Sequence, residues 1–424
     1  MLTINQIREN KDEVIRLLKI KNFDASSIIE QILQIDLERR NLRQSLDNLQ
    51  AEMNKTSEMI GKLFKEGKAS EANLAKEKTG QIKEEIRLKN EAFSKAESDQ
   101  HALLVLLPNT PNPSIVPGKS AADNEHIREG GKMITPNPSM IPHWDLAKKY
   151  DLIDFELGNK LTGSGFPVYK GKCAVLQRAL ISFFLDEATE AGYNEVMVPL
   201  MVNEDSGFGT GQLPDKEGQM YHATADNLYL IPTAEVPVTN MYRDVILNES
   251  DFPVRNTAYT PCFRREAGSY GKDVRGLNRL HQFDKVEIVR IEKPENSYQA
   301  LEEMVSYVES LVQKLELPYR IIRLCGGDMS FTSAMTYDFE VFSAAQDKWL
   351  EVSSVSNFES YQANRLMLRY KPTGEKKTRL AHTLNGSALA LPRIVAAILE
   401  NNQTENGIKI PECLVKYTKF DFIN

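Results

Sequence analysis

The sequence contains few cysteines and no long hydrophobic segment. Its four cysteines, Cys173, Cys262, Cys325 and Cys413, are far apart and form no Cys-x-x-Cys pair. This spacing excludes the common zinc-binding motifs and is typical of reduced cysteines in a cytoplasmic protein. No stretch approaches the roughly 18 apolar residues that a membrane span needs, and the N-terminus contains no apolar signal core. We therefore expect a cytoplasmic protein that does not associate with membranes.

The sequence also lacks an excess of positive charge, and it contains no internal repeat and no low-complexity tract. The 424 residues carry a net charge of -7 at pH 7, and 41% of them are hydrophobic. A chain of this length can bury a large core divided among roughly two or three domains. The negative charge excludes a basic protein that coats nucleic acid, so any contact with RNA requires a local basic surface.

Two heptad patterns predict a long antiparallel coiled-coil hairpin near the N-terminus. Apolar residues recur at heptad spacing from position 28 to about 65, and again from position 75 to 107. Between the two patterns, Gly67 provides a helix stop and Ser70 provides a new N-cap. At ~1.5 Å per residue, the first helix is about 55 Å long. We expect this arm to span about residues 28–104 within an N-terminal domain of residues 1–107.

The predicted arm is the basic part of the chain. Between Glu38 and Lys89 the sequence has twelve Lys or Arg residues and nine Asp or Glu residues. The charge pattern alone also fits a dimerisation or spacer hairpin whose charges are solvated.

Proline content marks the region that follows the arm. Seven of the 19 prolines fall within residues 108–142. Because neither a helix nor a central strand tolerates that density, we predict a linker over residues 108–143. Residues 144–424 mix helical and strand patterns, which predicts one α+β domain.

Guanidinium groups concentrate between the two apolar segments of residues 262–288, at Arg264, Arg265, Arg275 and Arg279. Arginine can donate two parallel hydrogen bonds to phosphate oxygens, so these side chains could converge on an anion. Glu266 lies two residues after Arg264 and would share its face on a strand. A solvated charged hairpin without a ligand would show the same short pattern.

The run Cys-Phe-Arg-Arg-Glu-Ala-Gly-Ser, which continues to Arg-Gly-Leu and His-Gln-Phe, resembles motif 2 of the class II aminoacyl-tRNA synthetases, and of the seryl-tRNA synthetases in particular. The resemblance implies an α+β, antiparallel-sheet catalytic domain with helices, preceded by a long α-helical hairpin. It also implies that Arg264 binds the α-phosphate of ATP and that Glu266 accepts a hydrogen bond from the adenine amino group. Phe283 would stack on the adenine ring, and Arg265 would lie in the same ATP site.

Two further segments resemble the other motifs of this class. A helical pattern over residues 173–191, a stop at Gly192 and a strand pattern over residues 193–199 resemble motif 1, which implies a homodimer. Residues 382–393 resemble motif 3, which implies Arg393 at the γ-phosphate of ATP and Ser387 near the amino acid. Pro392 and Ala388 depart from the usual motif 3 pattern, in which glycine is common at these positions.

The Thr-Ala-Glu sequence at residues 233–235 is expected to bind the amino-acid substrate. On composition alone, it is more typical of a turn that carries a solvated acid. In the seryl-tRNA synthetases this loop binds serine, so the resemblance assigns Thr233, Ala234 and Glu235 to an L-serine site. Glu287, in the strand pattern of residues 285–289, would face the same pocket and accept a hydrogen bond from the serine hydroxyl. An analogue without that hydroxyl would leave a buried polar group unpaired.

A probable strand contains the sequence Glu351, Val352, Ser353 and Ser354. It resembles the segment of the seryl-tRNA synthetases whose glutamate and second serine hold Mg²⁺ against the ATP phosphates. The resemblance assigns Mg²⁺ to Glu351 and Ser354 and places all four residues in the ATP site. Regular β alternation would put Glu351 and Ser354 on opposite faces unless a bulge intervenes.

The resemblance covers essentially the whole chain and implies serine–tRNA ligase activity. ATP would activate L-serine to seryl-adenylate, and the seryl group would then pass to the 3′ end of tRNA(Ser), and of tRNA(Sec) as well. Arg264, Glu351 and Arg393 would be the catalytic residues. His281 is either a general base or a structural histidine beside the loop. The arm would bind the tRNA through basic residues, for which the candidates are Arg39, Arg40, Arg43, Lys55, Lys76 and Lys78.

Two alternative functions use the same core. An amino-acid:carrier-protein ligase would form the adenylate but load a protein thiol, and such relatives lack the long basic hairpin. A synthetase-like RNA-binding protein would have lost its catalytic residues, whereas Arg264, Glu266, Glu351 and Arg393 are all present.

Overall fold

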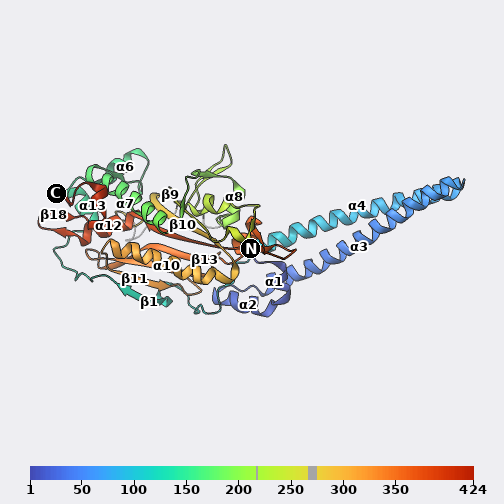
Figure 1. Cartoon of the computed structure of the whole chain (residues 1–424), viewed down its shortest axis with the longest axis horizontal. Helices are drawn as coiled ribbons and strands as arrows, with labels where there is room; N and C mark the ends of the chain where they lie inside the picture. Colours follow the sequence, from blue (N-terminus) through green and yellow to red (C-terminus); the bar gives the residue numbers. More distant parts are fainter. Residues whose placement is uncertain (216–217, 266–274) are drawn as a thin grey trace. The chain divides into compact units, whose positions relative to one another are not determined.

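A computed structural model describes residues 1–215, 218–265 and 275–424 of the chain (Figure 1). Glu266, which the sequence assigns to the ATP site, lies outside the described residues. The chain divides into two compact units. Unit 1 comprises Met1–Lys19 and Phe23–Pro108, and unit 2 comprises Ile20–Asn22 and Asn109–Asn424. In the described ranges, no helix is both long and apolar enough to cross a membrane.

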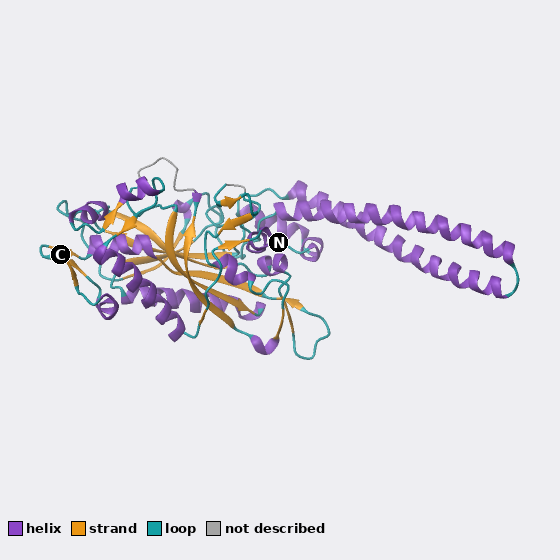
Figure 2. Cartoon of the chain, turned by 90° about the horizontal axis from the view of Figure 1, so that it is seen from above, coloured by secondary structure: helices purple, strands orange, loops and turns teal. Residues whose placement is uncertain are grey.

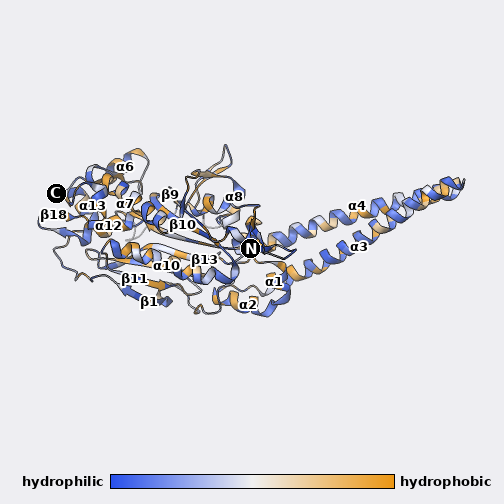
Figure 3. Cartoon of the chain, in the orientation of Figure 1, coloured by the Kyte–Doolittle hydropathy of each residue, from blue (hydrophilic) through white to orange (hydrophobic). Residues whose placement is uncertain are grey.

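Unit 1 is helical. The short helices α1 (Ile4–Glu9) and α2 (Lys11–Ile20) precede the long helices α3 (Ser26–Lys65) and α4 (Ala69–Leu106). The two long helices pack antiparallel along their length (Figure 2). Their surfaces are mainly hydrophilic, with apolar residues interspersed (Figure 3). Both helices bury apolar residues along the hairpin, including Ile32 and Leu46 of α3 and Ala75 and Ile82 of α4, which confirms the predicted helical hairpin.

In the turn of this hairpin, the predicted helix stop is confirmed and the predicted N-cap is wrong. Gly67 has φ +75°, a left-handed conformation that favours glycine, and it ends α3 as predicted. Ser70, however, is not an N-cap, because the chain returns to helical geometry at once and α4 begins at Ala69. Lys68 occupies the N-cap position without a side-chain hydrogen bond to the helix.

The core of unit 2 is a largely antiparallel sheet. Its strand order is β1 (Glu125–Gly130), β11 (Tyr319–Arg323), β12 (Met335–Ser343), β13 (Lys348–Asn357), β16 (His382–Ala390), β10 (Gln282–Glu292), β9 (Val254–Phe263) and β4 (Asn194–Glu195). Every pairing in this sheet is antiparallel except that of β4 with β9. The antiparallel-sheet prediction is therefore confirmed, and the motif 2 resemblance falls on the hairpin β9–β10.

Three helices cover the sheet with apolar side chains. They are α7 (Gly171–Glu190), α10 (Ser297–Lys314) and α12 (Leu391–Asn401), and each packs on several strands. Buried leucine, isoleucine and valine side chains of these helices form one hydrophobic cluster with the sheet. At ~25 cal/mol per Å² of buried apolar surface, this cluster provides the main stabilising contribution for the unit.

The segment predicted as motif 1 is helical as expected, but its strand is short. Gly192 has φ +83° and ends α7. The strand pattern over residues 193–199 yields only the two-residue strand β4, because pairing with β9 stops after the bond from Val196 N–H to Thr257 O. Val196 and Val198 instead pack against a small apolar cluster.

The predicted linker contributes an edge strand to unit 2. β1 pairs with β11, at the end of the sheet order. No proline occurs between Pro117 and Pro136, so this stretch retains the N–H donors that a strand requires. The proline count of the whole region did not indicate this strand.

Shorter elements complete unit 2. The helices are α5 (His143–Lys149), α6 (Phe155–Leu161), α8 (Glu204–Thr210), α9 (Glu235–Asn240), α11 (Tyr361–Leu366) and α13 (Glu412–Thr418). The strands are β2 (Ile153–Asp154), β3 (Val168–Tyr169), β5 (Met201–Val202), β6 (His222–Ala223), β7 (Leu228–Leu230), β8 (Ile246–Asn248), β14 (Arg369–Lys371), β15 (Arg379–Leu380), β17 (Gln403–Thr404), β18 (Gly407–Lys409) and β19 (Phe422–Ile423).

Candidate active site

A cavity of about 480 Å³ opens on the sheet of unit 2. Its walls come from the hairpin β9–β10, from β13 and β16, and from the starts of α9 and α12. It brings together most residues that the sequence assigned to the serine and ATP sites, namely Thr233, Glu235, Arg264, Phe283, Glu287, Glu351, Val352, Ser353, Ser354, Ser387 and Arg393.

Some predicted residues do not line this cavity. The side chain of Ala234 is buried in an apolar cluster with Val238 and Ala258, so only its backbone could face serine. Arg265 is exposed and its N–H donates to Gln219 O at 2.9 Å, so its role in ATP binding stays a prediction. The predicted convergence of four arginines is wrong for Arg275, whose guanidinium lies 4.5 Å from the ring of Trp144.

A buried ionic network forms one end of the cavity. The Nζ atom of Lys285 lies 2.5 Å from Oε2 of Glu287 and donates to Oγ1 of Thr233 at 2.8 Å. Thr233 Oγ1 in turn donates to Glu287 Oε2 at 3.1 Å, and Asn385 Nδ2 donates to Oε1 of Glu287 at 3.1 Å. Burial raises the pKa of Glu287, and the charge of Lys285 opposes the rise. Glu287 thus has partners on both oxygens and is fixed in orientation.

Glu235 lies beside this network but has no cationic hydrogen-bond partner in the described part of the chain. It begins α9 and is 6% exposed, and its Oε1 accepts from Gln362 Nε2 at 2.7 Å. Burial, followed by repulsion from Glu287, raises the pKa of Glu235 to about 7. A positively charged ligand group would offset the free-energy cost of burying the Glu235 carboxylate, so the position suits the α-ammonium group of an amino acid.

Arg264 and Arg393 also line the cavity, and the charge of Arg264 opposes the rise in the pKa of Glu235 and of Glu287. The Arg264 guanidinium lies 5.3 Å from the ring of Phe283, and its Nε donates to Pro232 O at 3.3 Å. Arg393 donates from Nη1 to Glu351 O at 2.7 Å and from Nε to Asn278 O at 3.0 Å. These contacts place the Arg264 guanidinium beside an aromatic ring and hold the Arg393 guanidinium at the cavity wall, an arrangement suited to a nucleotide and its phosphates.

The departures from the usual motif 3 pattern are accommodated. Pro392 lies in the first turn of α12, where a missing N–H costs no helix hydrogen bond. Ala388 is fully buried in the hydrophobic cluster of the unit. Neither replacement removes Arg393 from the cavity wall.

A β-bulge resolves the conflict between Glu351 and Ser354. In the pairing of β12 with β13, Phe339 faces Ser353 while the adjacent Glu340 faces Glu351, so Val352 is an extra residue. The bulge shifts the alternation by one position, and both Glu351 and Ser354 line the cavity. They offer one carboxylate and one hydroxyl, the hard oxygen donors that Mg²⁺ prefers. In the described ranges, no group of three or more His, Cys, Asp or Glu side chains could hold a metal alone, so an ion there would also need ligand oxygens.

His281 occupies a structural position. Its ring stacks on Phe166 with centroids 5.2 Å apart, and its Nδ1 lies 2.8 Å from Tyr221 Oη and 2.9 Å from Arg264 O. It does not line the cavity. The structural alternative therefore fits better than the general base.

The sequence did not identify several side chains that complete the cavity. Lys285 could have been predicted, because it lies two residues before Glu287 and therefore on the same face of β10. Asn385 lies in the motif 3 segment without a chemical signature of its own, and Gln362 comes from α11, far away in sequence. The contact of Arg393 with Asn278 also joins distant segments, which no local pattern indicates.

The predicted RNA-binding residues lie on α3 and α4, and they differ in how they are paired. Arg39 and Arg40 contact the buried carboxylate of Asp36 at 3.4 and 3.1 Å. Arg43 pairs with Asp47 at 3.2 Å, and Lys78 pairs with Glu52 at 2.7 Å. Within the described residues, Lys55 and Lys76 have no ion pair.

Comparison with known families assigns the core of unit 2. Residues 220–402 match the tRNA synthetase class II core domain (G, H, P, S and T), and residues 1–111 match the seryl-tRNA synthetase N-terminal domain. A largely antiparallel sheet that holds two arginines and buried carboxylates around one cavity agrees with that core. The fold and the site therefore define a class II aminoacyl-tRNA synthetase.

Individual relatives narrow this class to one family. The chain is 51% identical to a serine–tRNA ligase of Salinibacter ruber, over 99% of this chain and 98% of that protein. It is 46% identical to a serine–tRNA ligase of Methylacidiphilum infernorum over the full length of both. The crystal structure of a seryl-tRNA synthetase from Pyrococcus horikoshii complexed with ATP superimposes with a TM-score of 0.92 at 34% identity, covering 100% of this chain and 99% of that one. The chain belongs to the seryl-tRNA synthetase family, which confirms the predicted family and enzyme class.

Proposed function

We propose that the chain activates L-serine with ATP to form seryl-adenylate and pyrophosphate, and then transfers the seryl group to the 3′ end of tRNA(Ser). The observation that carries this proposal is the buried network of Thr233, Lys285 and Glu287 beside Glu235. It provides a carboxylate for the α-ammonium group and fixed polar atoms for a small hydroxyl side chain. The similarity to a seryl-tRNA synthetase complexed with ATP supports ATP as a substrate, and the similarity to serine–tRNA ligases supports serine.

The geometry favours catalysis by positioning and charge stabilisation. A carboxylate oxygen of serine attacks the α-phosphorus of ATP, the bond from that phosphorus to the bridging oxygen breaks, and pyrophosphate leaves. Arg264 would stabilise charge at the α-phosphate, and Arg393 would stabilise charge on the leaving group. No protein nucleophile takes part in this reaction.

Glu351 and Ser354 would hold Mg²⁺ in this site. They flank the bulge at Val352 and both line the cavity, near Arg393, whose Nη1 lies 3.6 Å from Glu351 Oε2. The ion would neutralise negative charge on the ATP phosphates. Ser354 also hydrogen-bonds Asp338 on the neighbouring strand, which fixes its side chain.

The proposal assigns a role to each part of the chain. Residues 1–107 would bind tRNA through the arm, residues 108–143 would form the linker, and residues 144–424 would catalyse both steps. The match of residues 1–111 to the seryl N-terminal domain supports tRNA over a carrier protein as acceptor. tRNA(Sec) is proposed as a second acceptor.

A homodimer in the cytoplasm completes the proposal. The segment after β4 exposes apolar surface, including Met197 at 96% exposure, where motif 1 is expected to form the dimer interface. Sedimentation at micromolar concentration should show a dimer, and a monomer alone would contradict this part of the proposal.

Amino-acid-dependent ATP–pyrophosphate exchange tests the proposed function. The purified chain with Mg²⁺ and without tRNA should exchange with serine, and not with alanine or glycine, which leave the buried polar atoms unpaired. Threonine tests the size limit of the pocket. Absence of exchange with every amino acid would favour a non-catalytic RNA-binding protein, and equal exchange with alanine would contradict the serine site.

A further inference from the structure

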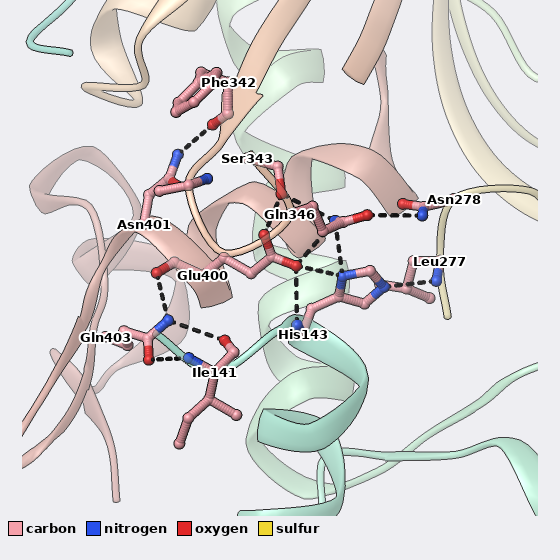
Figure 4. A network of polar contacts seen from close by, with 11 residues as sticks. Ile141, His143, Leu277, Asn278, Phe342, Ser343, Gln346, Glu400, Asn401 and Gln403 are labelled. Carbon is pink, nitrogen blue, oxygen red and sulfur yellow. Dashed lines mark hydrogen bonds and ion pairs between the residues drawn. The ribbon is translucent and has the colours of Figure 1, made fainter. Parts of the chain in front are cut away.

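Figure 4 shows a buried polar network that reaches Leu277 and Asn278, two residues that line the cavity. At its centre are His143, the first residue of α5, and Glu400, near the end of α12, and neither side chain is exposed to solvent. His143 Nδ1 lies 2.7 Å from Glu400 Oε1, and the His143 N–H donates to the same oxygen at 2.9 Å. These residues are separated by 257 positions in the sequence and belong to no motif named above.

Glu400 determines the direction of every hydrogen bond in this network. Despite burial, hydrogen bonds from His143 and Ser343 hold the pKa of Glu400 below its ordinary value, so its oxygens only accept. His143 Nδ1 must therefore carry the proton. Gln346 must present its amide nitrogen, which donates to Glu400 Oε1 at 3.0 Å.

Two chains of hydrogen bonds then run from Glu400 to Leu277 and Asn278, which are consecutive residues shortly before β10. Because Nδ1 of His143 is protonated, Nε2 is the acceptor, and it accepts from Leu277 N–H at 2.8 Å. Because the amide nitrogen of Gln346 faces Glu400, its Oε1 accepts from Asn278 Nδ2 at 2.9 Å. Both Leu277 and Asn278 line the cavity.

The network reaches the predicted ATP site in one more step. Asn278 O accepts from Arg393 Nε at 3.0 Å. Arg393 and Glu400 lie on the same helix, seven positions apart, which places them on one face. Gly276 packs so closely on the imidazole that a Cβ there would lie 2.2 Å from His143 Nε2. The chain segment of residues 276–278 is thus held between α5 and α12.

We infer that His143 and Glu400 are positioning residues that fix Leu277 and Asn278, and through them Arg393, in the geometry that binds ATP. This inference rests on the proposed function, because it assigns a cause to the ATP affinity of that same site. Neither residue touches a substrate. Their effect should therefore fall on ATP and not on serine, because the hydrogen bonds of Thr233, Glu235 and Glu287 go to other residues than those of this network.

Two substitutions of His143 separate its two hydrogen bonds. In His143→Asn, the amide nitrogen can replace Nδ1 toward Glu400 but the side chain is too short to reach Leu277. In His143→Gln, the amide oxygen can replace Nε2 as the acceptor for Leu277. Serine-dependent exchange should show the KM for ATP of the Asn variant raised roughly tenfold, the effect of one lost buried hydrogen bond. The Gln variant should recover most of this loss, and the KM for serine should change by less than about twofold in both.

A change on the loop side tests the same contact if the His143 variants do not fold. Gly276→Ala places a methyl group against His143 Nε2, at a residue whose φ of +67° also disfavours alanine, and should raise the KM for ATP without changing that for serine. His126→Asn is the matched control, because the side chain of His126 is exposed on the edge strand β1 and lies 3.5 Å from Glu129.

The wild-type chain separates failure of the inference from failure of the proposed function. No serine-dependent exchange by the wild type would overturn the proposed function. Wild-type exchange with an unchanged KM for ATP in the Gly276 and His143→Asn variants would overturn the inference. Equal rises in the KM for ATP and for serine would also overturn it, because they would indicate general damage to the fold.

Discussion

At the residue scale, the two buried carboxylates at the serine end of the cavity have unlike partners. Glu287 is paired with the ammonium group of Lys285, whereas the carboxylate of Glu235 accepts from the neutral amide of Gln362. With both carboxylates ionised, Lys285 pairs with Glu287, Arg264 is assigned to the ATP phosphate, and Glu235 has no hydrogen-bonded cation among the described residues. A ligand that brings one positive charge is therefore favoured, and a neutral ligand is not.

The affinity for serine should depend on pH through Glu235. Its pKa in the folded chain is about 7, above its ordinary value, so it takes up a proton as the pH falls through 7. The protonated acid no longer attracts the α-ammonium group, and the KM for serine should rise up to about tenfold per pH unit below that point. Exchange assays from about pH 6 to 8.5 measure this.

Glu235→Gln is the control for this dependence. Glutamine retains an oxygen that can accept from Gln362 but carries no charge at any pH. Its KM for serine should be high and independent of pH over the same range. A wild-type KM that stays flat across pH 7 would contradict the assignment of Glu235 to the ammonium group.

Arg264 should contribute to catalysis far more than to stability. Its Nε donates to one partly buried carbonyl, that of Pro232, while its guanidinium lies at the cavity. Arg264→Ala should reduce kcat/KM for exchange by roughly 10²–10³, the usual effect of removing a group that stabilises transition-state charge. Thermal unfolding should show little change. Arg264→Lys should recover only part of the rate because lysine lacks the planar fork, and near-normal exchange by the Ala variant would refute the role.

At the scale of elements, the bulge of β13 determines which side chains meet. Sequence alternation alone separated Glu351 from Ser354, and only the extra residue Val352 brings both to the cavity. A bulge depends on how the neighbouring strand pairs, which a single strand's sequence does not reveal. The arm hairpin, by contrast, could be predicted from sequence because heptad spacing is a local property of each helix.

Ser354→Ala should weaken the binding of Mg²⁺ at this bulge, and exchange should then need a higher Mg²⁺ concentration. Loss of one oxygen donor should raise the Mg²⁺ concentration for half-maximal exchange by roughly 3- to 10-fold and leave the KM for serine unchanged. Ser139→Ala, in an exposed loop, is the matched control. Removal of Mg²⁺ with a chelator should abolish exchange in all three proteins, and a Ser354 variant with wild-type Mg²⁺ dependence would contradict this metal ligand.

The pairing of charges within the arm predicts which basic residues matter for RNA. Lys55 and Lys76 have no ion pair in the described chain, whereas Arg39 contacts both Asp36 and Glu97. Lys55→Glu with Lys76→Glu should therefore lower tRNA(Ser) affinity by at least about tenfold and reduce its salt dependence. Filter binding at several salt concentrations measures this. Glu58→Lys is a surface control of opposite sign that should not weaken binding, and unchanged affinity of the double variant would place the RNA elsewhere.

At the scale of the whole molecule, the family, the antiparallel sheet and the arm followed from motifs and periodicity. The two-residue strand β4, the edge strand β1 and the network around Glu400 did not, because each depends on contacts between distant segments. The chain divides at Pro108 into units with separate cores, so each unit can be altered while the other is retained.

Shortening the arm should separate the two steps of the reaction. Arg39 lies opposite Glu97, and Lys78 lies opposite Glu52, so the helices are in register for excision of residues 46–89 and closure by a short glycine-containing turn. This change keeps the buried Asp36 cluster that joins Arg8 to α3. Serine-dependent exchange should stay within about twofold of the full chain, because every cavity residue lies in unit 2. Charging of tRNA(Ser) should fall at least about 100-fold, since the excision removes Lys55, Lys76 and Lys78 together with the outer part of the arm. Loss of exchange together with charging would show that the arm supports catalysis directly, and full charging by the shortened chain would exclude it as the tRNA-binding element.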